Sequence, residues 1–193
     1  MNKISLNPTN DYCPQTLFLY GTYGEHDEPD FGLFCWFSYI WDGELGVMAC
    51  IGGEKLTKER IHRNRIFSAN LVTEDLLPLA DYFGNTSGHD PEKMRVNVEI
   101  ETGRKLHVPV LAAARFAYEL EVKRTEPLED GEVMLCAIRN VCLDEKLAEE
   151  SVSLEERMRS LAPVQTTHSR YFSWDGRDLG AWGSLRQRIA GKA

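Results

Sequence analysis

The segment 55–65 carries five lysine or arginine side chains and a single acidic one, although the chain as a whole is acidic. Gly53, the second residue of a Gly-Gly pair, precedes it, and glycine lets a backbone approach a ligand closely. Thr57 is expected to cap a helix over residues 58–65, with Lys55 beside it. Because a helix start presents free N–H groups and a partial positive charge, this segment predicts an anion site, for instance for a phosphate. The alternative is a charged helix face that only contacts water.

A second group of candidate residues lies about twenty positions earlier in the chain. It is the run Cys35, Trp36, Phe37, Ser38 and Tyr39. Aromatic side chains and strand amides suit a flat heterocycle, which stacks on rings and takes hydrogen bonds at its edge. An ordinary hydrophobic core uses the same residue types, so both interpretations stay open.

Asn70 is a polar residue inside the apolar strand pattern 66–72, and Leu71 and Val72 follow it. An amide in such a strand needs hydrogen-bond partners. Its partner is expected to be either a bound ligand or a neighbouring loop.

The other polar candidates show no known catalytic pattern. The five histidines lack metal-ligand spacing, so no metal site is predicted, and His89 faces either a substrate or solvent from a polar loop. No nucleophile elbow, phosphate-binding loop or dinucleotide fingerprint is present. The five cysteines form no CxxC pair, and their odd number favours free thiols that act as small buried side chains.

The elements that must position these residues are mostly strands. Residues 31–42 alternate so that both faces are apolar, as in a central barrel strand covered by the core on one side and by a ligand or partner subunit on the other. Asp42-Gly43 predicts a hairpin turn to a return strand, 45–51. Further strands are expected over 17–23, 66–72, 114–123, 133–143 and within 163–174. Helices are expected between Thr73 and Gly84, over most of 144–161 and over 184–192.

Many strands and a few short helices, in mostly antiparallel order, predict a mainly β protein built as one small closed or split β-barrel domain, 1–193. The net charge of −8 argues against nucleic acid and against anionic lipid as partners. No apolar run reaches the roughly 20 residues of a membrane-spanning helix, and the N-terminus lacks a signal-peptide pattern. A cytoplasmic protein is therefore expected.

Six short motifs occur in a characteristic order, and they resemble those of the flavin reductase-like, FMN-binding split-barrel proteins, the family of flavoredoxin. They are 35–38 (CWFS), 55–57 (KLT), 67–71 (FSANL), 74–76 (EDL), 87–93 (SGHDPEK) and 113–122 (AARFAYELEV). The resemblance covers residues 15–145 and leaves 146–193 as a C-terminal extension.

The resemblance implies a Greek-key split β-barrel, a homodimer with FMN near the interface, and flavin reduction by NADH or NADPH. It also implies side-chain roles. Residues 36–39 would line the flavin, Lys55 and Thr57 would hold the phosphate beside Gly53, residues 70–72 would meet the ring edge, and His89 or Lys93 would reach the ligand from its loop. The flavin carries such chemistry itself, so no catalytic side chain is expected.

Two features depart from the family pattern. Cys35 stands where many relatives have serine or threonine, which weakens one expected hydrogen bond to the phosphate or ribityl chain of the cofactor. The aromatic segment 163–183 has no clear counterpart, and it is expected either to cover the flavin or to pack on a partner subunit. If it blocks substrate access, the protein would be an FMN-binding electron carrier with a redox partner protein and no nicotinamide site. A barrel without flavin is the third alternative.

Overall fold

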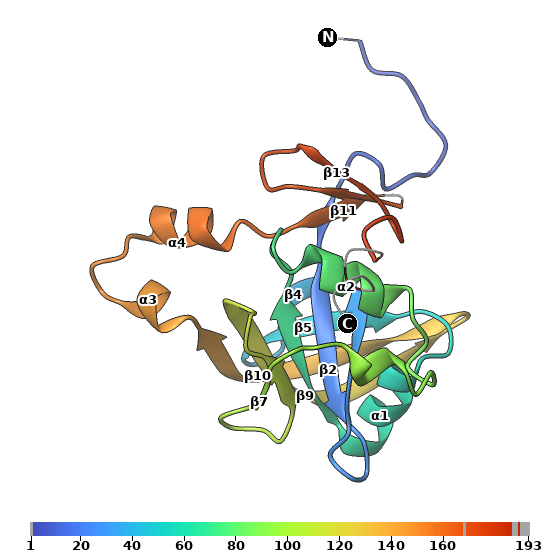
Figure 1. The fold of residues 1–193 in the computed structure, drawn as a ribbon. Coiled ribbons are helices and arrows are strands. Elements are labelled where there is room, and N and C mark those ends of the chain that lie inside the picture. The colour runs from blue at the N-terminus through green and yellow to red at the C-terminus, as the bar shows by residue number, and fades with distance from the viewer. Residues whose placement is uncertain (1, 168, 187–188, 190–193) are drawn as a thin grey trace.

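The computed structural model describes residues 2–167, 169–186 and 189, and the chain is mainly β (Figure 1). The strands are β1 (Gln15–Thr16), β2 (Phe18–Tyr23), β3 (Pro29–Phe34), β4 (Phe37–Trp41), β5 (Leu45–Ile51), β6 (Ile66–Leu71), β7 (Ile100–Thr102), β8 (Pro109–Leu111), β9 (Phe116–Leu128), β10 (Gly131–Leu143), β11 (Gln165–Thr167), β12 (Arg170–Phe172) and β13 (Asp178–Ala181). The helices are α1 (Leu56–Asn64), α2 (Leu77–Gly84), the 3-10 turn η1 (Lys93–Arg95), α3 (Glu145–Ala148) and α4 (Leu154–Leu161).

Seven strands form one antiparallel sheet in the order β3-β2-β6-β9-β10-β5-β4. The sheet curls, because the inward residues of β2 and β5 belong to one buried cluster although three strands separate them in the order. Edge strand β4 closes against β2 over this cluster. The ring of Phe37 on β4 lies 4.4 Å from that of Phe18 and 6.5 Å from that of Tyr20, both on β2. The predicted split β-barrel is therefore confirmed.

The connection from β5 to β6 is the Greek-key step of this barrel, because it passes over β10 and β9 to reach the other side of the sheet. Helix α1 makes this connection, and its Ile61 is buried in the barrel cluster. The helix therefore closes one end of the barrel and places its N-terminus at the rim.

The predicted single strand 31–42 is wrong, since the chain breaks at Cys35 and Trp36 into β3 and β4. The amide of Phe37 donates to the carbonyl of Cys35 at 3.0 Å, which is a tight local turn. The two halves also have different surroundings. Phe31 on β3 is fully buried, whereas Trp41 on β4 is 77% exposed. The apolar faces that suggested one central strand thus belong to two edge strands.

Both predicted helix caps are also corrected. Helix α1 begins at Leu56, one residue before Thr57, and the Thr57 hydroxyl donates to the Asp30 carboxylate instead of to the helix. Helix α2 begins at Leu77, where Pro78 supplies the fixed φ of a first helical turn. The predicted end at Gly84 is confirmed.

Three strands near the C-terminus and the short strand β1 form a second sheet with the order β1-β11-β12-β13, which we call the C-terminal sheet. The single strand expected within 163–174 is in fact two strands, β11 and β12, and β13 follows them. This sheet lies beside α2, while α3 and α4 extend away from the barrel (Figure 1). The helix expected over 184–192 falls largely outside the described residues. No helix in the described part of the chain is long and apolar enough to cross a membrane.

Candidate functional site

A cavity of about 650 Å³ opens beside the barrel, and four parts of the chain surround it. They are the end of β3 with the break at residues 35–36, the segment 52–57 that enters α1, the loop 83–89, and the C-terminal sheet. Since these parts are far apart in the sequence, the barrel and α2 are what bring them together.

One end of the cavity is cationic, with Lys55, Thr57 and Lys93 in its wall. The Lys93 ammonium lies 2.8 Å from a carboxylate oxygen of Asp30, and both side chains are only 3% exposed. The other Asp30 oxygen accepts from the Thr57 hydroxyl at 3.3 Å. Burial lowers the pKa of Lys93, and the neighbouring Asp30 opposes this shift. Asp30 therefore holds a cavity cation and a cavity hydroxyl in place.

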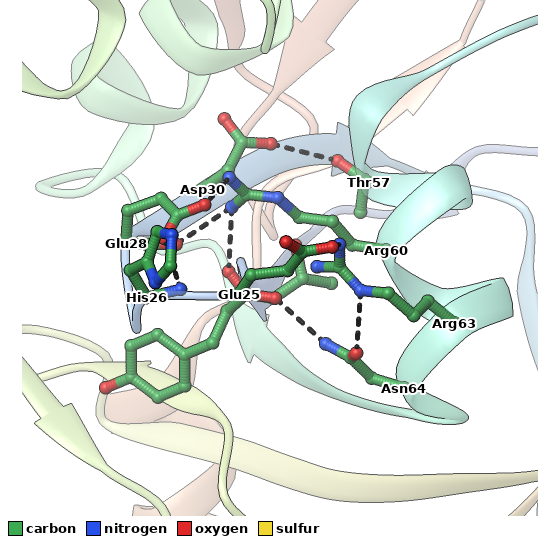
Figure 2. A network of polar contacts seen from close by, with 10 residues as sticks. Glu25, His26, Glu28, Asp30, Thr57, Arg60, Arg63 and Asn64 are labelled. Atoms are coloured by element: carbon green, nitrogen blue, oxygen red, sulfur yellow. Dashed lines mark hydrogen bonds and ion pairs between the residues drawn. The ribbon is translucent and has the colours of Figure 1, made fainter.

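Figure 2 shows how α1 is tied to the β2–β3 hairpin that carries Asp30. The Arg60 guanidinium donates to the carbonyls of Glu28 at 2.9 Å and Thr22 at 3.4 Å. It also pairs with the Glu28 carboxylate at 3.2 Å. The Asn64 amide donates to the Tyr23 carbonyl at 2.9 Å. These bonds explain part of the basic pattern in 55–65, because Arg60 serves the fold rather than a ligand.

Two glycines allow the cavity wall to pack closely. A methyl group on Gly32 would lie 2.7 Å from the Thr57 hydroxyl oxygen, and one on Gly88 would lie 2.7 Å from Leu56. Any side chain at these positions would push the loop or the strand away from the start of α1. The close approach keeps the cationic end compact.

The middle of the cavity is apolar and contains two thiols. Phe34, Trp36 and Phe83 provide aromatic surface, and Cys35 and Cys50 lie in the same wall. Burial raises the pKa of Cys35 to about 11, with Cys50 contributing, and burial also raises the pKa of Cys50. Both side chains are therefore neutral thiols at neutral pH.

The structure brings only part of the predicted site together. Cavity-lining predicted residues are Cys35, Trp36, Lys55, Thr57, His89 and Lys93. Predicted residues that do not line it are Phe37, Ser38, Tyr39, Gly53, Asn70, Leu71 and Val72. His89 lies at the rim, with its Nε2 3.1 Å from a Glu59 carboxylate oxygen, and both side chains are exposed.

The residues outside the cavity have other surroundings. Asn70 is fully buried, donates to the Leu19 carbonyl at 3.0 Å and the Ser68 hydroxyl at 2.9 Å, and accepts from the Leu111 amide at 2.9 Å. Of the two interpretations of Asn70, the structure supports the tie to a neighbouring segment. The side chain of Tyr39 turns outward, where its hydroxyl lies 2.6 Å from that of Tyr118.

Sequence reasoning missed several lining residues. They are mainly in β3, in the loop after α2, and in the C-terminal sheet: Gly32, Leu33, Phe34, Asn85, Thr86, Tyr171 and Trp182. The aromatic and glycine-rich composition of 163–183 was the available signal for the last two. No local pattern signals the others, because their role depends on which strand the cavity adjoins. Among the described residues, no group of three His, Cys, Asp or Glu side chains is placed to hold a metal ion.

A split β-barrel with one large cavity, cationic at one end and aromatic along its wall, defines a ligand-binding split-barrel protein. The family model for the flavin reductase like domain matches residues 11–173. The chain therefore belongs to the flavin reductase-like domain family, as its motif order indicated. The match also extends into the C-terminal part, beyond the region 15–145. No curated protein matches the chain in sequence.

Solved structures similar to this chain share its fold at low sequence identity. Flavoredoxin from Methanosarcina acetivorans is 17% identical with a TM-score of 0.76, over 90% of this chain and 91% of that one. An FMN-binding protein from Thermus thermophilus is 18% identical with a TM-score of 0.71, over 90% and 93%. A protein with a split-barrel domain from Shewanella frigidimarina is 14% identical with a TM-score of 0.74, over 85% and 84%.

Proposed function

We propose that this protein is an FMN-binding oxidoreductase that uses NADH or NADPH to reduce the flavin and passes the electrons to an acceptor. The observation that carries the proposal is the cavity itself, in which a cationic end and an aromatic wall share one space within a flavin reductase-like domain. Its volume of about 650 Å³ lies within the range of cofactor sites, roughly 300–1,000 Å³. The names of the similar flavoredoxin and FMN-binding protein agree with this ligand.

The residues present fit a flavin mononucleotide. Lys55, Thr57 and Lys93 would hold the phosphate, since ammonium and hydroxyl groups are its usual partners. Phe34 and Trp36 would contact the rings. Cys35, a neutral thiol, offers only a weak hydrogen bond where a serine or threonine would offer a strong one.

A bound flavin supplies the electron-transfer chemistry, and the chain supplies binding, orientation and shielding from water. Lys93 lies in the cavity wall beside Asp30, which pairs with it at 2.8 Å and opposes the lowering of its pKa by burial. Residues of β3 and of the loop 83–89 form adjoining parts of the cavity wall, because a methyl group on Gly84 would lie 2.9 Å from the Leu33 side chain.

The first experiment is the absorption spectrum of the purified protein with added FMN, followed by titration of variants. Lys55→Ala is expected to weaken FMN binding about tenfold, because an ammonium group at the phosphate is lost. Arg63→Ala is the matched control, since Arg63 lies in the same helix but pairs with Glu25 at 2.9 Å, and neither residue lines the cavity. A wild-type protein that retains no FMN at micromolar concentration contradicts the proposal.

Anaerobic mixing with NADH or NADPH tests the oxidoreductase step. Loss of the oxidised flavin absorbance within seconds is the expected result. If dithionite reduces the flavin but neither nucleotide does, the protein is instead an FMN-binding electron carrier that depends on a redox partner protein.

We further propose that the protein is a homodimer with FMN near the interface. An exposed apolar face beside β4 supports this, and we call it the β4 face: Tyr39, Trp41, Leu45 and Val141, each at least half exposed. Tyr39, Leu45 and Val141 line a common hollow. Trp36 lines the cavity and directly precedes β4, so a ligand there would lie close to a partner that covers this face.

A further inference from the structure

The C-terminal sheet is attached to α2 by one buried carboxylate. Asp81 is fully buried, and its two oxygens accept from the Tyr171 hydroxyl at 2.6 Å and from the backbone amides of Gly183 at 2.6 Å, Leu185 at 2.8 Å and Arg186 at 3.0 Å. The side-chain amide of Asn85, at the end of the same helix, donates to it as well at 3.0 Å. A buried carboxylate without a basic partner is costly unless hydrogen bonds satisfy it. These five donors satisfy Asp81, and four of them come from the C-terminal part, so the segment 183–186 has one position on the helix.

Trp182 is the residue that this attachment places at the cavity. Its ring lines the cavity and remains 48% exposed. The indole Nε1 donates to the Thr166 hydroxyl at 2.9 Å, and the Trp182 amide donates to the Ser169 carbonyl at 3.0 Å. The Tyr171 ring lies 6.4 Å away. An exposed indole is therefore held in a fixed orientation by contacts on its other side.

The segment that carries Trp182 and the cationic group adjoin different ends of the loop from Asn85 to Gly88. A methyl group on Gly183, next to Trp182, would lie 3.3 Å from the Asn85 side-chain oxygen. A methyl group on Gly88 would lie 3.1 Å from the Asp30 carboxylate. The loop from Asn85 to Gly88 thus runs from the indole to the cationic end. A ligand that spans this loop needs a planar part at one end and an anionic part at the other.

We propose that Trp182 stacks on the planar ring of the flavin and that Asp81 is the positioning residue that holds Trp182 there. This inference rests on the proposed function and adds a selectivity: the cavity prefers a ring joined to a phosphate over a phosphate alone. A stacked aromatic ring contributes most when its orientation is already fixed, because no side-chain freedom is lost on binding.

The test uses flavin fluorescence, which a stacked indole quenches. Trp182→Ala is expected to weaken the binding of FMN and of riboflavin by the same factor, about five- to twentyfold. It is also expected to increase the fluorescence of the bound flavin. Lys55→Ala should weaken the binding of FMN but leave the affinity for riboflavin within twofold of wild type. Trp182→Phe, which keeps a stacking ring, should restore affinity to within about threefold of wild type. Trp174→Ala is the matched control, because Trp174 is equally exposed at 48% but does not line the cavity.

Asp81→Asn tests the positioning role. It removes the charge that the five donors satisfy, so flavin affinity should fall toward that of Trp182→Ala, and amide exchange should accelerate at residues 183–186. The double variant should bind no more weakly than Trp182→Ala alone, because both changes remove one interaction.

The outcomes separate the two proposals. If wild type retains flavin but Trp182→Ala binds within twofold and quenches normally, only this inference is overturned. It is also overturned if Trp174→Ala matches Trp182→Ala. If wild type retains no flavin, the proposed function and this inference fail together.

Discussion

Asn70 illustrates how a polar residue in a strand serves the fold instead of a ligand. Its amide contacts two other segments through Leu19 and Leu111, and Ser68 in its own strand, and water does not reach it. The resemblance assigned it to the flavin edge, whereas its hydrogen bonds are already used within the protein.

We therefore predict that Asn70→Ala lowers the free energy of unfolding without changing the cavity. The loss is expected to be about 2–3 kcal/mol, since the Leu111 amide would be left buried without its acceptor. Urea unfolding measures it. FMN affinity of the folded variant should stay within twofold of wild type. A large loss of affinity at unchanged stability would contradict this prediction and indicate that Asn70 contacts the ligand.

The thiols allow a second prediction at the scale of single residues. Burial raises the pKa of Cys136 to about 12, and burial with the nearby Glu119 carboxylate raises that of Cys142 to about 11. Since only thiolates react quickly, both should alkylate slowly at pH 7.5, as should Cys35 in the cavity. Cys13 is exposed and should be labelled first by iodoacetamide. Peptide mass spectrometry resolves the order, and labelling of Cys35 as fast as Cys13 would contradict it.

Between elements, one carboxylate joins strand β9 to the loop after β7. Glu119 is fully buried and accepts from the amides of Arg104 at 2.7 Å, Lys105 at 2.8 Å and Leu106 at 2.5 Å, and from the Asn140 side chain at 2.7 Å. Burial alone would raise its pKa, but these hydrogen bonds outweigh burial and hold the pKa below the usual 4.5.

This shift predicts an acid-sensitive contribution to stability. A carboxyl with a lowered folded-state pKa stabilises the fold above its unfolded pKa, near 4.5, and loses that contribution as the pH falls through the folded value. Glu119→Gln should cost about 2–3 kcal/mol at pH 7 and less at pH 3. Urea unfolding at both pH values checks it. An equal cost at both would show that the charge of Glu119 does not stabilise the fold.

The break between β3 and β4 also shapes both the cavity and the β4 face. One continuous strand would have kept Cys35 and Trp36 in a regular ladder. Instead the turn at these residues lets β3 face α2 and the cavity, while β4 pairs with β5 and presents its outer side to solvent. The same break thus serves both the cavity and the exposed β4 face.

At the scale of the whole molecule, the β4 face predicts association. Large exposed apolar side chains gathered on one face of a soluble protein usually mark an interface. Trp41→Glu should shift the protein from dimer to monomer in sedimentation velocity, because a carboxylate would be buried at the contact. Tyr12→Glu is a matched control, since Tyr12 is 78% exposed but lies in the N-terminal segment. A wild-type protein that sediments as a monomer contradicts the proposal.

The local sequence pattern determined much of the barrel by itself. The alternation in 45–51 gave a strand with the predicted bounds, and the Asp42-Gly43 pair placed the hairpin turn, where Gly43 has a φ of 77°. The basic run 55–65 and its glycine lead-in marked the helix that enters the cavity. These features depend on neighbours within a few residues, which is why periodicity and turn chemistry reveal them.

Only the tertiary structure decided which residues share the cavity. Asp30 and Lys93 form a buried ion pair, and Asp81 accepts a hydrogen bond from Gly183, about a hundred residues further along the chain. Trp182 acquires its role from that contact. Such pairs are set by how the sheet curls and where α2 packs, and no spacing along the chain encodes either. The sequence therefore predicted a flavin-type barrel and its cationic end, whereas the buried carboxylates and the aromatic wall required the folded chain.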